Sequence, residues 1–396
     1  MAIFNDFGTI ANIIWIVLFV AMIFLYPKMM ITQMLWKLDQ TLSMLDGYTK
    51  KAKGITTRKI SKSPSKELSE KIENFLEFFA IQPVNLDPYG IVKKIEHIEV
   101  LSEKRFKHFV KRVAPKMSEE EQANTMMTLA GTMSLNQISK IVKHFIELIK
   151  KTKSWQLGLI LQMQLPLIER ISKALLRGTE AFANGWPVGD SVGGMVVAKM
   201  AGKSEMKPIE EDTVMARKRI KGKSVILIKA GGPGGRLGRL GKAVEKMSKR
   251  QKVAKIITVD AAAKLEGEKT GSVAEGVGVA IGGLGVDRAY IESLAVSKDI
   301  PLDTFVIKMS QEEAIMPMHL DVLKSSGKVV SMVEDNIAET RERGVIIVVG
   351  VGNTCGIGND AKSVESADRT IRKAAQIMKR RDEEEKPKKR WWDFGF

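Results

Sequence analysis

The chain has 396 residues, of which 63 are Lys or Arg and 46 are Asp or Glu, so its formal net charge is +17. This length exceeds one ordinary hydrophobic core, and we expect at least two domains. The single cysteine excludes an internal disulfide and a cysteine-rich zinc site, and the 4 histidines show no metal-ligand spacing. Cations and acids are interspersed and no aromatic-rich RNA motif is present, so nucleic acid is not an expected partner.

Residues 7–27 contain no charged side chain. At about 1.5 Å per residue, a helix of this length crosses the roughly 30 Å of a bilayer core, which predicts one transmembrane helix. A cleaved signal peptide is the alternative, but no Lys or Arg precedes the apolar run and no small-residue cleavage site follows it. Cations outnumber acids in residues 28–62, and this bias predicts a single-pass protein of the cell membrane with its body in the cytoplasm.

The juxtamembrane segment, residues 28–62, is expected to continue the helix and then to form a basic linker. Its apolar residues at helical spacing are Ile31, Met34, Leu35, Leu38, Leu42 and Leu45. Such a stripe packs against another helix, and docking onto the protein's own body is favoured over self-association. Residues 50–62 combine lysines with small polar residues, which indicates a linker beside anionic lipid headgroups.

Residues 63–183 have the pattern of an all-α domain. Ser63-Pro64 and Asp87-Pro88 each resemble an N-cap followed by proline at the first helical position, and Ser118-x-x-Glu121 forms a capping box. The uncharged run at residues 155–168 is too short to cross a bilayer, so we interpret it as the buried central helix of a bundle. A second membrane pass is the alternative.

Residues 184–381 alternate short β-branched runs with helical stretches. The runs lie at residues 225–229, 256–259, 305–308 and 345–349. This alternation predicts an α/β domain with a largely parallel sheet. The expected fold class is therefore a C-terminal α/β domain, preceded by an all-α domain and one N-terminal transmembrane helix.

Two aspartates in glycine-rich surroundings are the candidate catalytic residues: Asp190 in GWPVGDSVGG and Asp260 at the end of the run KIITVD. An acid at the carboxyl end of a strand faces the crevice where α/β proteins bind ligands. Two carboxylates placed close together hold one proton near neutral pH and so provide an acid and a base for hydrolysis. The structural alternative is that Asp190 only caps a helix over residues 192–200.

The order of motifs in this domain carries a family resemblance. VGDSVGG, VILIKAGGPGG, VDAAAKLE and KTGSVAEGVGVAIGGLGVD follow one another as in the superfamily of the spore germination protease and the hydrogenase maturation endopeptidases, which this domain resembles. The resemblance implies a phosphorylase/hydrolase-like sheet, a peptide substrate, and Asp190 and Asp260 as the acidic pair. It does not extend to a nickel-binding histidine, because the first histidine after residues 305–308 is His319. The chain as a whole resembles an archaeal family of membrane-anchored proteins of unknown function.

A third acid is an alternative member of the pair. The segment VIIVVGVGNTCGIGND at residues 345–360 also consists of a strand, a glycine turn and an acid, Asp360. It resembles the opening strand and turn of the same superfamily but lies at the other end of the domain. Either Asp190 or Asp360 could therefore accompany Asp260.

The loop AGGPGGRLGRLGK after the first strand is a candidate anion site. Glycine amides, a helix N-terminus and cations together attract phosphate. The known phosphate motifs do not fit, because Arg236, Leu237 and Ala243 occupy positions that those motifs give to other residues. The residues of this tentative ligand site are Gly231, Gly232, Gly234, Gly235, Arg236 and Lys242. A strand-to-helix turn without a ligand is the equally weighted alternative.

The C-terminal tail, residues 382–396, has an acidic run followed by lysines and four aromatic residues. A basic-aromatic segment settles at a lipid interface, with a disordered tail as the alternative. Two functions are then open: a membrane-tethered, peptidase-like hydrolase, or a non-catalytic membrane-tethered scaffold that recognises an anionic ligand or a protein partner. No cofactor is indicated.

Overall fold

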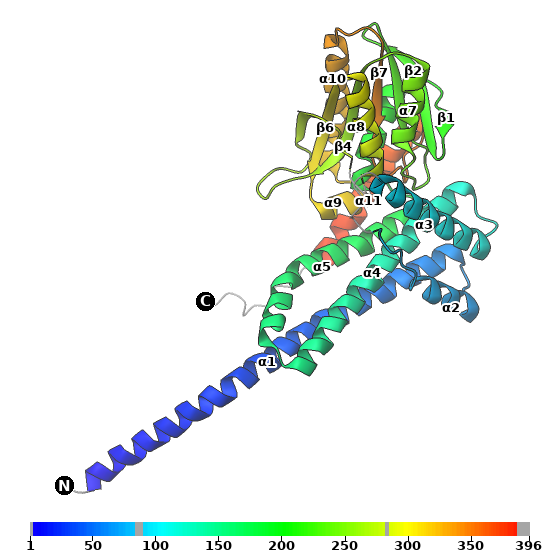
Figure 1. Cartoon of the computed structure of the whole chain (residues 1–396). Coiled ribbons are helices and arrows are strands. Elements are labelled where there is room, and N and C mark those ends of the chain that lie inside the picture. Colours follow the sequence, from blue (N-terminus) through cyan, green and yellow to red (C-terminus); the bar gives the residue numbers. More distant parts are fainter. Residues whose placement is uncertain (1–2, 84–89, 282–284, 386–396) are drawn as a thin grey trace. The chain divides into compact units, whose positions relative to one another are not determined.

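The computed structural model describes residues 3–83, 90–281 and 285–385 (Figure 1). The chain divides into two compact units. The first comprises Met1–Lys51 and Ser134–Lys173, and the second comprises Ala52–Met133 and Ala174–Phe396. Three long helices, α1 (Ile3–Ile60), α4 (Glu119–Thr152) and α5 (Trp155–Asn184), contribute to both units.

The first unit is a helical bundle with its own apolar core. The predicted stripe of α1 lies inside this core, where Leu38 and Leu45 are buried against Val142 and Ile146 of α4 and Leu165 of α5. Inside the bundle, the Thr41 hydroxyl of α1 donates to the Glu169 carboxylate of α5 at 3.0 Å. The stripe therefore docks onto the protein's own helices, as the spacing predicted.

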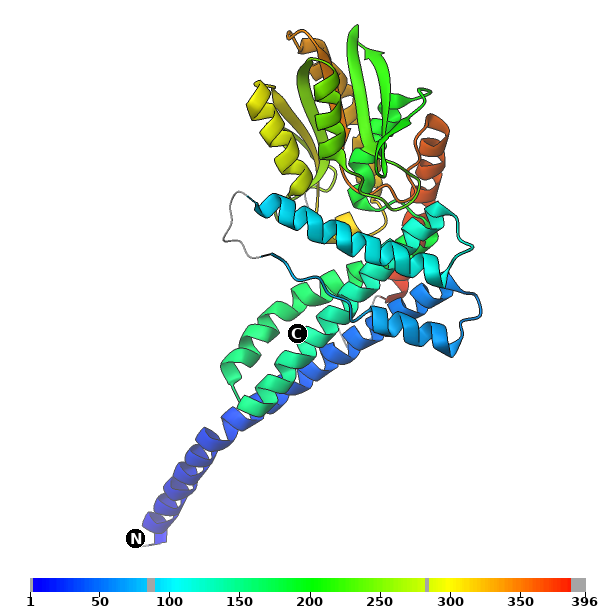
Figure 2. The same cartoon turned by 45° about the vertical axis from the view of Figure 1, so that its right-hand side comes forward.

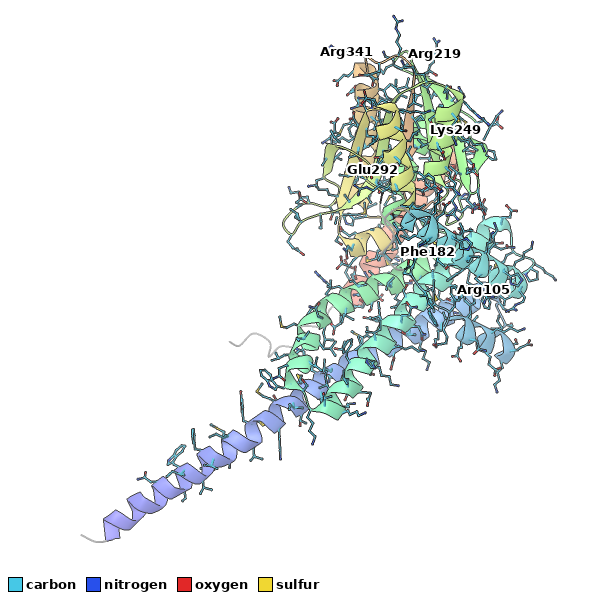
Figure 3. All side chains as sticks on the ribbon, in the orientation of Figure 1. Arg105, Phe182, Arg219, Lys249, Glu292 and Arg341 are labelled. Atoms are coloured by element: carbon cyan, nitrogen blue, oxygen red, sulfur yellow. The ribbon has the colours of Figure 1, made fainter. Side chains whose placement is uncertain are left out.

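The first part of α1 is long and apolar enough to cross a bilayer, and no other helix of the described residues is. The side chains of this stretch are exposed and project from the helix (Figure 3). Because these side chains are exposed, this part of α1 is not the buried core helix of a soluble domain. The two remaining interpretations are a membrane helix and a signal sequence. The expected linker at residues 50–62 is helical as far as Ile60, because Ala52 and Thr56 are buried and the Thr56 hydroxyl bonds that of Thr132 at 2.7 Å.

The uncharged run at residues 155–168 does not form the buried central helix that we expected. Leu161 and Leu165 face the bundle core, but Leu159, Ile160 and Met163 are exposed on the other side of the same helix. The absence of charge indicated burial, yet burial depends on neighbouring elements, and the described residues cover only one face of this helix.

The helical part of the second unit consists of α2 (Lys66–Phe75), α3 (Ile91–Val113), the start of α4 and the ends of α1 and α5. Phe75 stacks on Phe109 with ring centroids 4.0 Å apart. The capping box at Ser118 and Glu121 is confirmed, since each backbone N–H bonds the other residue's side chain. The N-cap of α2 is Ser65, two residues later than predicted, and Asp87-Pro88 lies outside the described residues.

The α/β domain contains one seven-stranded sheet in the order β1-β2-β3-β7-β4-β6-β5. The strands are β1 (Lys207–Glu210), β2 (Thr213–Ile220), β3 (Lys223–Ala230), β4 (Val253–Ala263), β5 (Val273–Val277), β6 (Leu302–Met309) and β7 (Val345–Gly350). The four predicted runs became β3, β4, β6 and β7, and these four pair in parallel. The outer strands pair antiparallel. The predicted fold class is thus confirmed.

Helices cover both faces of this sheet (Figure 2). Helices α7 (Leu240–Arg250) and α8 (Val286–Lys298) share one apolar core with the sheet. Helices α6 (Val192–Ala201), α10 (Leu320–Glu339) and α11 (Ala361–Glu385) pack in the other. After β7 the chain continues to α11 on one face, and after the neighbouring strand β4 it continues through β5 to α8 on the other face. Ligand crevices of α/β proteins form where the connections that follow two neighbouring strands run to opposite faces of the sheet.

Candidate functional site

A cavity of about 690 Å³ lies at the carboxyl ends of β4 and β7, within the second unit. Asp260 of β4 and Val351 and Gly352 after β7 line its floor, together with Asp190. The remainder is lined mainly by residues of α3, α4, the glycine loop, the β1–β2 turn and the start of α8. The predicted crevice therefore exists at the expected edge of the sheet, and both candidate acids line it.

Asp190 lies in a short 3-10 turn, Gly189–Ser191, immediately before α6. Its carboxylate Oδ2 accepts a hydrogen bond from the backbone N–H of Asn353 at 2.8 Å, across the loop that follows β7. The first turn of α6 has no side-chain cap, so Asp190 does not have the capping role that was the structural alternative. Protein surrounds the carboxyl group at the cavity wall, and this burial raises the pKa of Asp190 against the opposing effect of the Asn353 hydrogen bond.

Glycines allow this turn to approach the sheet. A Cβ on Gly193 would lie 2.3 Å from the carbonyl oxygens of both Val259 and Val351, and one on Gly352 would lie 2.0 Å from the carbonyl oxygen of Asp190. Only glycine permits such contacts between backbones. The glycines of GDSVGG and GVGN therefore place Asp190 beside the ends of β4 and β7.

Asp260 lies within β4, which continues to Ala263 and not, as expected, only to residue 259. Its neighbour Val259 pairs with Gly350, the last residue of β7, so Asp260 lies just beyond the end of β7. The residue is buried, and its Oδ1 accepts from the backbone N–H of Ala261 at 2.7 Å. The structure thus brings Asp190 and Asp260 to one cavity from segments 70 positions apart.

Asp360 is not among the cavity-lining residues. It is exposed at the start of α11, where its carboxylate accepts from the backbone N–H of Ser363 at 2.7 Å. These hydrogen bonds from Ser363 lower the pKa of Asp360. Asp360 therefore caps a helix, and of the two alternative partners it is Asp190 that lines the cavity with Asp260.

Sequence reasoning missed six further acids of the cavity, which are Glu99, Glu103, Glu119, Glu211, Asp212 and Asp287. Burial raises the pKa of Glu99 and Glu103 on α3 and of Asp287 on α8, although Arg239 opposes the effect in all three. The backbone N–H of Gly241 donates to Asp287 at 2.7 Å. Their spacing along α3 puts Glu99 and Glu103 on one helix face, but no sequence signal shows that this face turns toward the sheet.

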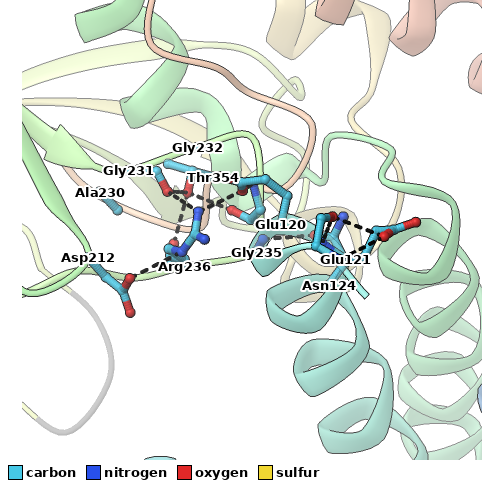
Figure 4. A network of polar contacts seen from close by, with 12 residues as sticks. Glu120, Glu121, Asn124, Asp212, Ala230, Gly231, Gly232, Gly235, Arg236 and Thr354 are labelled. Carbon is cyan, nitrogen blue, oxygen red and sulfur yellow. Dashed lines mark hydrogen bonds and ion pairs between the residues drawn. The ribbon is translucent and has the colours of Figure 1, made fainter. Parts of the chain in front are cut away.

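The glycine loop of the tentative anion site is held by the protein's own acids (Figure 4). Arg236 bonds Glu120 at 2.6 Å and Asp212 at 3.1 Å. The backbone N–H of Gly234 donates to Glu120, and that of Gly235 donates to Asn124 at 2.8 Å. The loop therefore joins the start of α4 to the sheet.

The other members of the tentative anion site have internal partners as well. The N–H of Gly231 donates to the carbonyl of Asp212 at 2.8 Å, and that of Gly232 donates to Asn359 at 3.0 Å. Lys242 forms an ion pair with Glu96 of α3. Anion binding at this loop stays a prediction, and an entering anion would have to displace these carboxylate and carbonyl partners.

Lys229, a fully buried lysine of β3, was also missed by sequence reasoning. Its Nζ donates to the Ala230 carbonyl at 2.8 Å and to Asn359 Oδ1 at 2.9 Å. Burial lowers the pKa of Lys229 to about 7. Because Asn359 also bonds Gly232, Lys229 connects the strand, the glycine loop and the segment before α11.

Comparison with known proteins identifies a family but no function. Residues 188–358 match a domain of unknown function, DUF1512 C-terminal, and residues 12–185 match the DUF1512 N-terminal domain, also of unknown function. No curated protein and no solved structure matches the chain, so the resemblance to the germination protease superfamily receives no support. Since the two matched domains together span most of the sequence, the chain belongs to the DUF1512 family.

Proposed function

We propose that this chain is a membrane-anchored hydrolase whose acid–base site is the cavity containing Asp190 and Asp260. The observation that carries this proposal is that Asp190 and Asp260, from separate segments, line one cavity near the carboxyl ends of β4 and β7. A cavity that contains acids of perturbed pKa is the typical setting of general acid–base chemistry.

The raised pKa of Asp190 assigns it the acid role. Asp260 accepts a proton from water as the water oxygen attacks the carbonyl carbon of the substrate. Asp190 donates its proton to the leaving group as the bond to the carbonyl carbon breaks, and exchange with solvent restores both groups. The exposed apolar stretch of α1 anchors the enzyme in the cell membrane, with the α/β domain on the cytoplasmic side.

The test is hydrolysis by the full-length chain, purified in detergent and supplied with a mixed library of fluorogenic peptide amides and esters. Asp190→Asn and Asp260→Asn should each reduce the rate at least about 100-fold, the contribution of one general acid or base. Asp360→Asn is the matched control, because Asp360 is exposed and caps α11, and it should retain the wild-type rate.

Two results would contradict the proposal. One is wild-type turnover that Asp190→Asn or Asp260→Asn leaves unchanged, and the other is no turnover of any amide or ester by the folded wild-type chain. In the second case a thermal-shift screen of the same compounds would show whether the cavity binds a ligand without chemistry, as a scaffold would.

A further inference from the structure

The tip of the α4–α5 hairpin carries an exposed apolar face beside α1. Met163 is 74% exposed and Ile160 59%, and Trp155, Leu159 and Leu167 lie on the same side of α5. No described residue covers this face. Isolated exposed apolar side chains are ordinary, but five on one helix face indicate a binding surface.

This face continues the exposed apolar surface of α1. A hollow of about 550 Å³ lies between the two helices, lined by Tyr26, Met30 and Met34 on one side and by Trp155 and Leu159 on the other. Gly158 of α5 packs so closely on Met34 that a Cβ there would lie 2.0 Å from its methyl carbon. The start of α5 is therefore held next to the part of α1 where its charge-free stretch ends.

The chemistry at this end of the bundle matches a lipid interface. Trp36 and Trp155 are exposed, and tryptophan concentrates at the boundary between headgroups and acyl chains. Lys28, Lys37, Lys151 and Lys153 are also exposed on α1 and at the hairpin tip, where they suit anionic headgroups. An apolar helix face flanked by lysines is the pattern of a helix that lies in the membrane interface.

We infer that the first turns of α5 form a second membrane contact, in which Trp155, Leu159, Ile160 and Met163 lie in the interfacial layer of the bilayer that α1 crosses. The inference rests on the membrane anchor of the proposed function. The hollow between α1 and α5 then accommodates an acyl chain. With two contacts the bundle cannot swivel freely about α1, so the membrane also orients the first unit.

The test places an environment-sensitive fluorophore on single introduced cysteines in the full-length chain, reconstituted into phosphatidylcholine–phosphatidylglycerol vesicles. The native Cys355 is buried, and burial raises the pKa of its thiol to about 12, so it reacts little. The labelled variants are Ile160→Cys on the apolar face, Leu18→Cys in the stretch that crosses the membrane, and Gln137→Cys as the control. Gln137 is exposed on α4, about 20 Å along the helix from the hairpin tip.

Lipids with nitroxides on their acyl chains should quench the label on I160C at least twofold, and that on L18C more strongly, while Q137C stays unquenched. Quenching of L18C without quenching of I160C would overturn the α5 contact and leave the anchor intact. No quenching of L18C would overturn the anchor and the α5 contact together. Protection of I160C from aqueous iodide without nitroxide quenching would mean that protein covers the face, and would also overturn the inference.

Discussion

Two glycine-rich segments follow strands of the same sheet, and they differ in what their polar groups contact. In the loop after β3, Arg236 and the amides of Gly234 and Gly235 bond acids and amides from the start of α4. In the turn that holds Asp190, glycines instead bring a carboxyl group to the wall of the cavity, which the loop after β3 also lines with Arg236 and Arg239. Glycine content alone therefore does not distinguish a loop whose polar groups already have partners from a turn that presents a carboxyl group to a cavity.

The charge balance of the two regions explains the difference. The loop after β3 contributes cations, and these are neutralised by Glu120, Glu103 and Glu96 of the helical part. The cavity contains acids whose ionisation burial opposes, since the pKa values of Asp190, Glu99, Glu103 and Asp287 are all raised, although Glu103 is also the ion-pair partner of Arg239. Satisfied ion pairs hold a structure together, whereas desolvated acids are typical of reactive sites.

The largest expected change in stability comes from a substitution in the close packing of α6 on β4 and β7. Gly193→Ala places a methyl group 2.3 Å from two backbone carbonyl oxygens, so α6 must move away from β4 and β7. We expect the free energy of unfolding to fall by about 3 kcal/mol, at the upper end of overpacking effects. Gly194→Ala is the control on the same helix, since its nearest atom is the Thr354 methyl carbon at 3.3 Å. Equal melting temperatures for the two variants would contradict the close approach.

A smaller effect on stability is expected where the loop after β3 contacts the start of α4. Arg236→Ala leaves Glu120 and Asp212 without their shared cation, and the Arg236 side chain is only 13% exposed. We expect a loss of about 2 kcal/mol in the free energy of unfolding, less than for a fully buried pair because Glu120 is partly solvated. Lys249→Ala removes the surface pair with Glu245 (Lys249 is labelled in Figure 3) and should cost less than about 0.5 kcal/mol. Denaturant titration of both variants measures these changes. If Arg236→Ala lowers the free energy of unfolding no more than Lys249→Ala does, the ion pairs of Arg236 stabilise the protein no more than an exposed surface pair.

The smallest effect is a pH dependence of opposite sign at two aspartates. Because the pKa of Asp190 is raised, its stabilising contribution is full below the ordinary carboxyl pKa of 3.8 and is lost as the pH rises through the raised value. Asp190→Asn keeps an oxygen that accepts from Asn353, so it should raise the melting temperature slightly at pH 7 and not near pH 3.

The pKa of Asp360 is lowered, so its contribution to stability is present above pH 3.8 and is lost as the pH falls through the lowered value. Asp360→Asn should therefore lower the melting temperature at pH 7. A lower melting temperature of Asp190→Asn at pH 7 would mean that the hydrogen bond to Asn353 outweighs burial.

Local signals in the sequence predicted many elements correctly. The β-branched runs that became β3, β4, β6 and β7, the capping box at Ser118, and the apolar stripe of α1 depend on residues within a few positions of one another. Two predictions failed at positions where distant neighbours decide. Residues 50–60 are helical because Thr56 meets Thr132, and one face of α5 is exposed because no described element covers it.

The sequence by itself determined the order of the helical and α/β regions, the charge-free stretch of α1 and the two aspartates that deserved testing, because helical spacing, β-branched runs and hydrophobicity act locally. Only the tertiary structure decided that Asp190 and not Asp360 shares a cavity with Asp260, that α3 adds Glu99 and Glu103 to that cavity, and that Arg236 and Lys242 are already paired. The physical reason is that pKa values, ion pairs and cavities depend on groups that come from segments far apart in the chain. How the helices pack on the two faces and the edge of the sheet decides which of these groups become neighbours.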